Sequence, residues 1–309
     1  MTFGHNYIGG QRSAQGDVRL HSVDATTGEA LPGDFFQATE AEVAAAAQAA
    51  AAAFPTFRNL APEQRAVFLD AIADELDALG DDFVASVCRE TALPAGRIQG
   101  ERGRTSGQMR LFAKVLRRGD FLGARIDRAL PDRQPLPRVD LRQMRIGIGP
   151  VAVFGASNFP LAFSTAGGDT AAALAAGCPV VVKAHSGHML TAEAVADAIL
   201  RAAERTGMPA GVFNMVYGGG VGEWLVRHPA IQAVGFTGSL RGGNALCRIA
   251  AERPQPIPVF AEMSSINPVI LLPEALRTRG ETIARELAAS VTICLLYTSD
   301  AADEEDRVI

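Results

Sequence analysis

Two polar side chains in the second half of the chain could take part in catalysis. Asn158, in a Ser-Asn-Phe-Pro-Leu segment, carries an amide that can stabilise a developing oxyanion. Glu262 follows the apolar run Pro-Val-Phe-Ala, where partial burial would raise its pKa and suit it to general base catalysis. Each has a plainer interpretation, because a turn asparagine often bonds its own backbone and a glutamate after a strand often caps or pairs. Both interpretations stay open for the two residues.

Two further positions could hold a phosphate. The segment Gly-Ser-Leu-Arg-Gly-Gly at 238–243 follows an apolar strand pattern and opens a helix pattern. Its glycines permit close backbone approach, and a helix N-terminus offers free N–H groups to an anion. Lys183 ends the run Pro-Val-Val-Val and would place a cation beside the same crevice. Neither motif is specific alone, since strand-to-helix turns need glycine and lysines at strand ends are often only solvated.

The elements that must position these residues alternate along the chain from Gly149 onward. Short β-branched runs such as Pro-Val-Ala-Val-Phe and Pro-Val-Val-Val-Lys alternate with small-residue or amphipathic helical patterns. This alternation predicts parallel strands joined by βαβ crossovers, and hence an open α/β sheet. Ligands of such sheets bind at the carboxyl ends of the strands, where Asn158, Lys183 and Gly238 all fall.

The first part of the chain is predicted to be helical. An alanine-rich segment, Glu40 to Ala53, follows Thr39, and Thr39 with Glu42 matches a capping box. A second helix is expected from Pro62 to Leu79, with Gly80 as its stop, and helical patterns also cover 82–90 and 96–116. A Pro-rich stretch at 130–137 precedes residues 139–147, whose alternation predicts a long exposed strand that needs a partner.

Composition narrows the class of protein. The 309 residues are 48% hydrophobic and 20% charged, which is typical of a globular protein with a sizeable core. A net charge of -5 gives no reason to expect nucleic acid or an anionic membrane as partner. No apolar run could span a bilayer and the N-terminus lacks a signal-peptide pattern, so we expect a cytoplasmic protein. Its scattered cysteines predict neither a metal site nor a disulfide framework, and they are Cys88, Cys178, Cys247 and Cys294.

In order and spacing, these motifs resemble the aldehyde dehydrogenase superfamily from about residue 7 to residue 293. The resemblance implies that Asn158 forms the oxyanion hole and that Glu262 is the general base. It also implies that Lys183 contacts the adenine ribose and that Gly238 and Ser239 hold the pyrophosphate. The expected fold is then a Rossmann-type dinucleotide-binding domain with an oligomerisation arm and an incomplete catalytic domain, and the resemblance implies a homo-oligomeric parent protein.

Three segments resemble one branch of that family, the dehydrogenases of 2-oxoglutarate semialdehyde (2,5-dioxopentanoate). They are Glu-Met-Ser-Ser-Ile-Asn-Pro at 262–268, Glu-Arg-Gly-Arg-Thr at 101–105 and Val-Lys-Ala-His at 182–185. The resemblance implies oxidation of this small aldehyde to 2-oxoglutarate through a cysteine thioester. Dehydrogenation of another semialdehyde remains an alternative, and the presence of Glu262 disfavours a CoA-acylating enzyme.

The cofactor is expected to be NADP or NAD. An NAD site tends to place a carboxylate near the ribose 2′-hydroxyl, where it would repel a 2′-phosphate. The cofactor-binding positions after Lys183 are instead His185 and Ser186, while Gly243 and Arg241 lie in the phosphate turn. Because none of these residues is acidic, they would not repel the 2′-phosphate of NADP. The semialdehyde of a dicarboxylic acid needs a cation for its distal carboxylate, and the candidates on one predicted helix are Arg102, Arg104 and Arg110.

The resemblance implies a cysteine nucleophile, and the flanking residues of the candidate do not match the family pattern. Cys294 lies 32 residues after Glu262, close to the family's separation, but it lacks the flanking glycine and glutamine. It also begins a run, Cys-Leu-Leu-Tyr-Thr-Ser-Asp-Ala-Ala-Asp-Glu, that resembles the translated read-through of a transposon-based sequencing adapter. We therefore expect the chain as written to be inactive, with a genuine acidic C-terminus as the alternative. A catalytically inert dinucleotide-binding or oligomerisation fragment is the competing functional class.

The expected domain division follows from these assignments. Residues 1–123 and 146–264 would form the two segments of the cofactor-binding domain, and residues 124–145 the oligomerisation arm. Residues 265–293 would begin the catalytic domain, and residues 294–309 would be an artefactual tail. An arm without the far C-terminal strand that it meets in the family, together with an uncovered apolar face, predicts poor solubility and a marginal fold.

Overall fold

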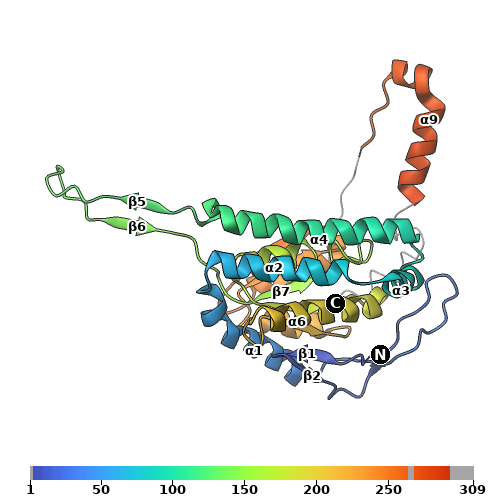
Figure 1. Ribbon diagram of the computed structural model, residues 1–309, viewed down its shortest axis with the longest axis horizontal. Helices are drawn as coiled ribbons and strands as arrows, with labels where there is room; N and C mark the ends of the chain where they lie inside the picture. The colour runs from blue at the N-terminus through green and yellow to red at the C-terminus, as the bar shows by residue number, and fades with distance from the viewer. Residues whose placement is uncertain (1–2, 264–267, 293–309) are drawn as a thin grey trace.

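A seven-stranded sheet forms the centre of the computed structural model, which describes residues 3–263 and 268–292 (Figure 1). The strand order is β11-β10-β7-β8-β9-β1-β2. The parallel strands are β7 (Val151–Phe154), β8 (Val180–Lys183), β9 (Phe213–Val216), β10 (Ala233–Thr237) and β11 (Val259–Glu262). The antiparallel edge is formed by β1 (Asn6–Ile8) and β2 (Gln11–Ser13). The predicted α/β class with a parallel sheet is confirmed.

The register of the sheet aligns the carboxyl ends of its parallel strands. Phe154, the last residue of β7, pairs with Lys183 on one side and with Phe236 on the other, and Thr237 pairs with Glu262. The chain passes from β7 outward to β8 and β9, then returns to the other side of β7 for β10 and β11. This reversal is a topological switch point, the place where open α/β sheets bind ligands.

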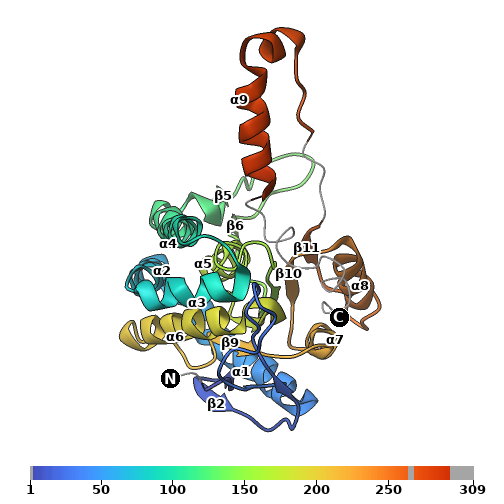
Figure 2. The same cartoon turned by 90° about the vertical axis from the view of Figure 1, so that its right-hand side faces the viewer.

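Helices cover both faces of the sheet because the strands are apolar on both sides. Val151 and Val153 of β7 belong to one buried cluster, while Ala152 and Phe154 belong to the other. On the first face lie α2 (Pro62–Asp77), α4 (Ala95–Arg118), α5 (Gly168–Ala175) and α6 (Met189–Arg205), with α3 (Asp81–Thr91) beside them. On the second face lie α7 (Val221–Arg227) and α8 (Leu240–Ala251), together with most of α1 (Glu40–Arg58). Figure 2 shows the two helical layers on either side of the strands.

The first two helices begin where the sequence predicts and end elsewhere. Thr39 accepts from the Glu42 backbone N–H at 3.2 Å, and the Glu42 side chain accepts from the Thr39 N–H at 2.9 Å, which confirms the capping box. Pro62 occupies the predicted first turn of α2. The expectation that α2 ends at Leu79 with Gly80 as its stop is wrong: the helix ends at Asp77, and Gly80 caps the N-terminus of α3.

The segment expected as an arm forms a hairpin that projects from the body beyond the end of α4 (Figure 1). After a short 3-10 turn, η1 (Asp120–Leu122), strands β5 (Arg125–Asp127) and β6 (Leu141–Gln143) pair antiparallel. The exposed strand therefore has a partner within the chain, but it is three residues long, shorter than the alternation at 139–147 predicted. Apolar side chains along the hairpin face solvent: Ile126 is 63% exposed and Val139 is 68% exposed.

The remaining elements lie outside the main sheet. Strands β3 (Arg19–Leu20) and β4 (Phe35–Phe36) pair with each other, and a 3-10 turn, η2 (Ser186–His188), precedes α6. Helix α9 (Pro273–Thr292) stands away from the body in Figures 1 and 2, and the described side chains along it are exposed or half-buried. Across the described residues, none of the helices has both the length and the apolarity that a bilayer crossing requires.

Candidate active site

The structure brings the four sequence-predicted positions to one edge of the sheet. Lys183 ends β8, Glu262 ends β11, and Gly238 follows β10 directly. Asn158 lies in the turn after β7, the strand between β8 and β10. Since these parallel strands are neighbours in aligned register, all four positions lie on the side of the sheet where ligands of this architecture bind.

Lys183 is the most constrained of these residues. The residue is only 7% exposed, and within the described part of the chain no carboxylate lies within ion-pair distance of its ammonium group. Burial lowers the pKa of Lys183 to about 8, because the charged form loses solvation without gaining a partner. An uncompensated buried cation at the ligand-binding edge is suited to bind an anionic or strongly polar ligand.

The turn after β8 carries two histidines, one of which sequence reasoning missed. His185 accepts a hydrogen bond on Nδ1 from the Gly187 N–H at 3.1 Å and stacks against His188, with ring centroids 4.9 Å apart. Ser186 is half-buried in the same turn. His188 has no exposed surface, and its Nδ1 lacks a hydrogen-bond partner among the described residues. Burial lowers the pKa of His188 to about 4, so the ring is neutral at pH 7.

The glycine turn after β10 leads into the N-terminus of α8. Ser239 is the N-cap residue, and its Oγ accepts from the Gly242 N–H at 3.1 Å. The hydroxyl proton remains able to donate to a phosphate oxygen. At Gly243 a Cβ would lie 2.3 Å from the Met263 sulfur, and at Gly238 it would lie 2.7 Å from the Phe236 ring. Both glycines are therefore needed for packing, and the helix end they shape fits an anion.

The turn that carries Asn158 is held by residues distant in sequence. Asn158 is half-buried, and the Ala156 N–H donates to the Phe163 carbonyl at 2.8 Å. Glu101 of α4 accepts hydrogen bonds from the N–H groups of Leu161 and Ala162, both at 2.9 Å. The sequence motifs did not single out Glu101 as a site residue. Through these two hydrogen bonds it holds the backbone of the turn in place.

Glu262 differs from expectation. We expected partial burial, but the residue is exposed. The physical reason is its strand: β11 is an edge strand of the sheet and has a neighbour only on the β10 side. The position of Glu262 at the carboxyl edge of the sheet agrees with a role in the site. The partial burial that was expected to suit it to general base catalysis is not present in the described structure.

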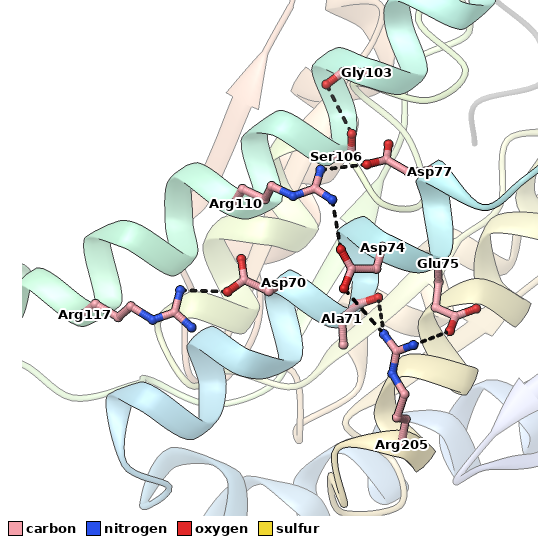
Figure 3. Close-up of polar contacts among 10 residues, drawn as sticks. All are labelled: Asp70, Ala71, Asp74, Glu75, Asp77, Gly103, Ser106, Arg110, Arg117 and Arg205. Atoms are coloured by element: carbon pink, nitrogen blue, oxygen red, sulfur yellow. Dashed lines mark hydrogen bonds and ion pairs between the residues drawn. The ribbon is translucent and has the colours of Figure 1, made fainter.

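The three arginines proposed for substrate binding make different contacts in the structure. Arg110 pairs with Asp74 at 2.9 Å and with Asp77 at 2.8 Å, in a surface network between α4 and α2 (Figure 3). Arg102 donates to the backbone oxygen of Leu79. Arg104 instead stacks on aromatic rings beside the Asn158 turn. Arg102 and Arg110 are thus held in structural contacts.

Other candidate groups lie apart from this edge or outside the description. Cys178 is buried and Cys247 is half-buried. Cys294 lies outside the described residues. A pocket formed by Gly10, Asp197 and Gly211 adjoins the start of β9, at the end of the sheet opposite the site, and includes none of the predicted residues. In the described ranges, no group of three potential ligand side chains could hold a metal ion.

Comparison with known proteins adds information that the geometry does not contain. The sequence model described as "Aldehyde dehydrogenase family" matches residues 12–290. The alpha-ketoglutaric semialdehyde dehydrogenase of Acinetobacter baylyi is 60% identical over 287 residues, which cover 93% of this chain and 55% of that protein. Alpha-ketoglutaric semialdehyde dehydrogenase 2 of Azospirillum brasilense is 56% identical, with 94% of this chain and 56% of that protein covered.

Solved structures agree with the sequence matches. Aldehyde dehydrogenase C from Pseudomonas syringae, solved with NAD+ and octanal, superimposes with a TM-score of 0.74 at 26% identity, covering 87% of this chain and 52% of that one. The chain spans about half the length of the curated relatives it matches. The similarity therefore extends over nearly all of this chain and over only part of each relative.

Proposed function

The chain belongs to the aldehyde dehydrogenase family, and from this premise we propose that it supplies the cofactor-binding part of an enzyme that oxidises 2-oxoglutarate semialdehyde to 2-oxoglutarate. The observation that carries the proposal is 60% identity over 93% of the chain to a relative named for this substrate. Alpha-ketoglutarate and 2-oxoglutarate are two names for one compound. The positions of Asn158, Lys183, Gly238 and Glu262 at adjacent strand ends support it.

We propose NAD or NADP as the cofactor. Lys183, with His185 and Ser186, would hold the adenosine ribose, and Gly238, Ser239 and Gly243 would hold the pyrophosphate at the start of α8. The residues fit such a group because Lys183 is a buried cation without a described carboxylate partner. When bound, the nicotinamide supplies the hydride acceptor for the oxidation. His185 stands near the position where an NAD-preferring site tends to carry an acid, which supports NADP.

Asn158 and Glu262 would act on the substrate itself. The Asn158 amide would donate a hydrogen bond to the oxygen of the aldehyde carbon as negative charge develops there. Glu262 would accept a proton from the water that hydrolyses the acyl intermediate. An exposed carboxylate is a weak match for this role. We propose that residues 265–293 begin the catalytic domain. Residues 124–145 would serve as the oligomerisation arm.

Oxidation of an aldehyde to an acid in this scheme also needs a thiolate nucleophile. Cys294 is the candidate near the required separation from Glu262, and its flanking sequence argues against it. The second candidate function is therefore a dinucleotide-binding unit without turnover. It is favoured by the exposure of Glu262.

The test combines binding and turnover on the full chain. NADPH and NADH binding would be measured by fluorescence titration for the wild type, for Lys183→Met and for the matched control Lys114→Met, whose side chain is exposed on α4. We expect Lys183→Met to weaken binding and Lys114→Met to leave it unchanged. Absence of binding by the wild type would contradict the proposal.

Turnover separates the two candidate functions. The wild type and Cys294→Ala would each be incubated with 2-oxoglutarate semialdehyde and NADP or NAD, and the reduced cofactor would be followed. Cofactor binding without oxidation favours the binding unit for this chain. Oxidation that disappears in Cys294→Ala would assign Cys294 as the nucleophile and would refute the expectation of inactivity.

A further inference from the structure

We propose that Arg104 binds the carboxylate of the substrate that lies remote from the aldehyde. The proposal rests on the proposed function, since it assumes a dicarboxylic semialdehyde whose reacting carbon lies near Asn158. It selects one residue and assigns it the recognition of the single carboxylate that this substrate carries. Three features of the structure support it, namely the face of α4 on which Arg104 lies, its aromatic contacts and the absence of an acidic partner for it among the described residues.

The first feature is the position of Arg104 on α4. Arg97, Glu101 and Arg104 lie at helical spacing on one face of this helix. Glu101 contacts the N–H groups of Leu161 and Ala162, so this face meets the turn that follows Asn158. The Arg104 guanidinium carbon lies 5.6 Å from the ring centre of Phe159, the residue next to Asn158. Arg104 thus contacts the residue that follows the proposed oxyanion donor, while it belongs to a separate element.

The second feature is how the guanidinium is held. Its carbon also lies 5.0 Å from the ring centre of Phe163, and the two rings meet edge to face, with centroids 5.2 Å apart. Stacking on aromatic faces orients the planar guanidinium and leaves its N–H donors in the plane free to bind. Such donors match the two oxygens of a carboxylate in a bidentate pair. The aromatic rings therefore prepare Arg104 for an anion.

The third feature is that Arg104 has no acidic partner in the part of the chain that the structure describes. Arg97 also stacks on Phe159, at 4.5 Å, but it is neutralised by Glu101 at 2.5 Å. Arg110 is neutralised by Asp74 and Asp77 (Figure 3). In the described part of the chain, Arg104 is exposed and no acidic side chain lies within ion-pair distance of it. Its charge is available to a ligand, whereas the charges of its two neighbours on α4 are already compensated.

The test compares two probes that differ in one group. 2-Oxoglutarate carries the remote carboxylate, and levulinate has a methyl group in its place with the rest of the molecule unchanged. Binding of each to the NADP-loaded chain would be measured by ligand-observed NMR for the wild type, Arg104→Gln and the matched control Arg110→Gln. Levulinate cannot form the charge-assisted hydrogen bonds between Arg104 and the remote carboxylate. We therefore expect the wild type to bind 2-oxoglutarate about tenfold more tightly than levulinate.

Arg104→Gln should remove this preference, Arg104→Lys should retain part of it, and Arg110→Gln should retain all of it. The proposal is overturned if Arg104→Gln keeps the preference or if the wild type shows none. NADPH binding by each folded variant, measured on the same protein preparations before NADP is added, separates this outcome from failure of the proposed function. A chain that binds NADPH but does not distinguish the two probes would refute the role of Arg104 alone.

Discussion

His188 donates a hydrogen bond from Nε2 to the backbone oxygen of Ala156, at 3.1 Å. Because the acceptor is a carbonyl, the proton must lie on Nε2, which leaves Nδ1 as the buried atom without a described partner. His188 follows Lys183 by five residues and Ala156 precedes Asn158 by two. A single imidazole therefore joins the turn proposed to hold the cofactor ribose to the turn proposed to stabilise the oxyanion.

Acid should destabilise the chain through His188. Its pKa falls from 6.5 in the unfolded chain to about 4 in the fold, so between these values the unfolded state binds the extra proton. Stability should decrease as the pH falls through this window, by up to roughly 3 kcal/mol. Denaturant unfolding at several pH values would measure it. His188→Gln keeps the donor to Ala156 without titrating, and parallel curves for the two proteins would show that His188 does not contribute.

Lys183 should destabilise the folded chain when no cofactor is bound. Below about pH 8 the folded state holds a buried ammonium, whereas the unfolded state keeps it solvated. The unfolding free energy should therefore rise between about pH 8 and 10.5, and Lys183→Met should stabilise the chain at pH 7 by up to roughly 3 kcal/mol. Thermal and denaturant unfolding would test this against Lys114→Met. A destabilised Lys183→Met variant would contradict the assignment of an uncompensated charge.

Cofactor affinity should depend on the protonation of the same lysine. An anionic ligand favours the charged ammonium, so binding should take up a proton near pH 8. The dissociation constant for NADPH should rise as the pH passes above about 8, by at most about tenfold per unit. Fluorescence titrations across this range would reveal the dependence. A flat profile in the wild type would exclude Lys183 as an anion ligand.

Loss of the Glu101 charge should loosen the Asn158 turn. Glu101→Gln retains one acceptor oxygen and leaves Arg97 without its buried partner. We expect a loss of about 1–3 kcal/mol in unfolding free energy. The matched control is Glu63→Gln, whose carboxylate is 61% exposed and pairs with Arg117, with an expected loss below about 1 kcal/mol. Equal losses for both variants would show that the buried contacts add nothing.

The parts of the fold that depend on local sequence were predictable. The start of α1 follows from Thr39 and Glu42, three residues apart, and the parallel strands follow from short apolar runs between helical patterns. The end of α2 was not predictable, because Gly80 serves the next helix and not the preceding one. The extent of β6 was overestimated, since alternation marks exposure without fixing how many residues pair.

The candidate site was predictable only where a residue adjoins its own strand. Lys183 and Gly238 fall at strand ends that the sequence marks. The exposure of Glu262 depends on β11 being an edge strand, which is a property of the whole sheet. The roles of Glu101 and His188 depend on partners 60 and 32 residues away along the chain, and no local pattern records such contacts.

The strand order also bears on how the protein is made. On a ribosome β7, β8, β9 and β10 emerge before β11, which is an edge strand of the sheet and follows them in sequence. These four strands can therefore pair before Glu262 has been synthesised. An interrupted translation product that stops after α8 would still contain Lys183, Gly238 and Ser239. Such a shortened chain would keep the residues proposed to bind the nucleotide. It would lack the carboxylate of Glu262, which is proposed to accept a proton from the hydrolytic water.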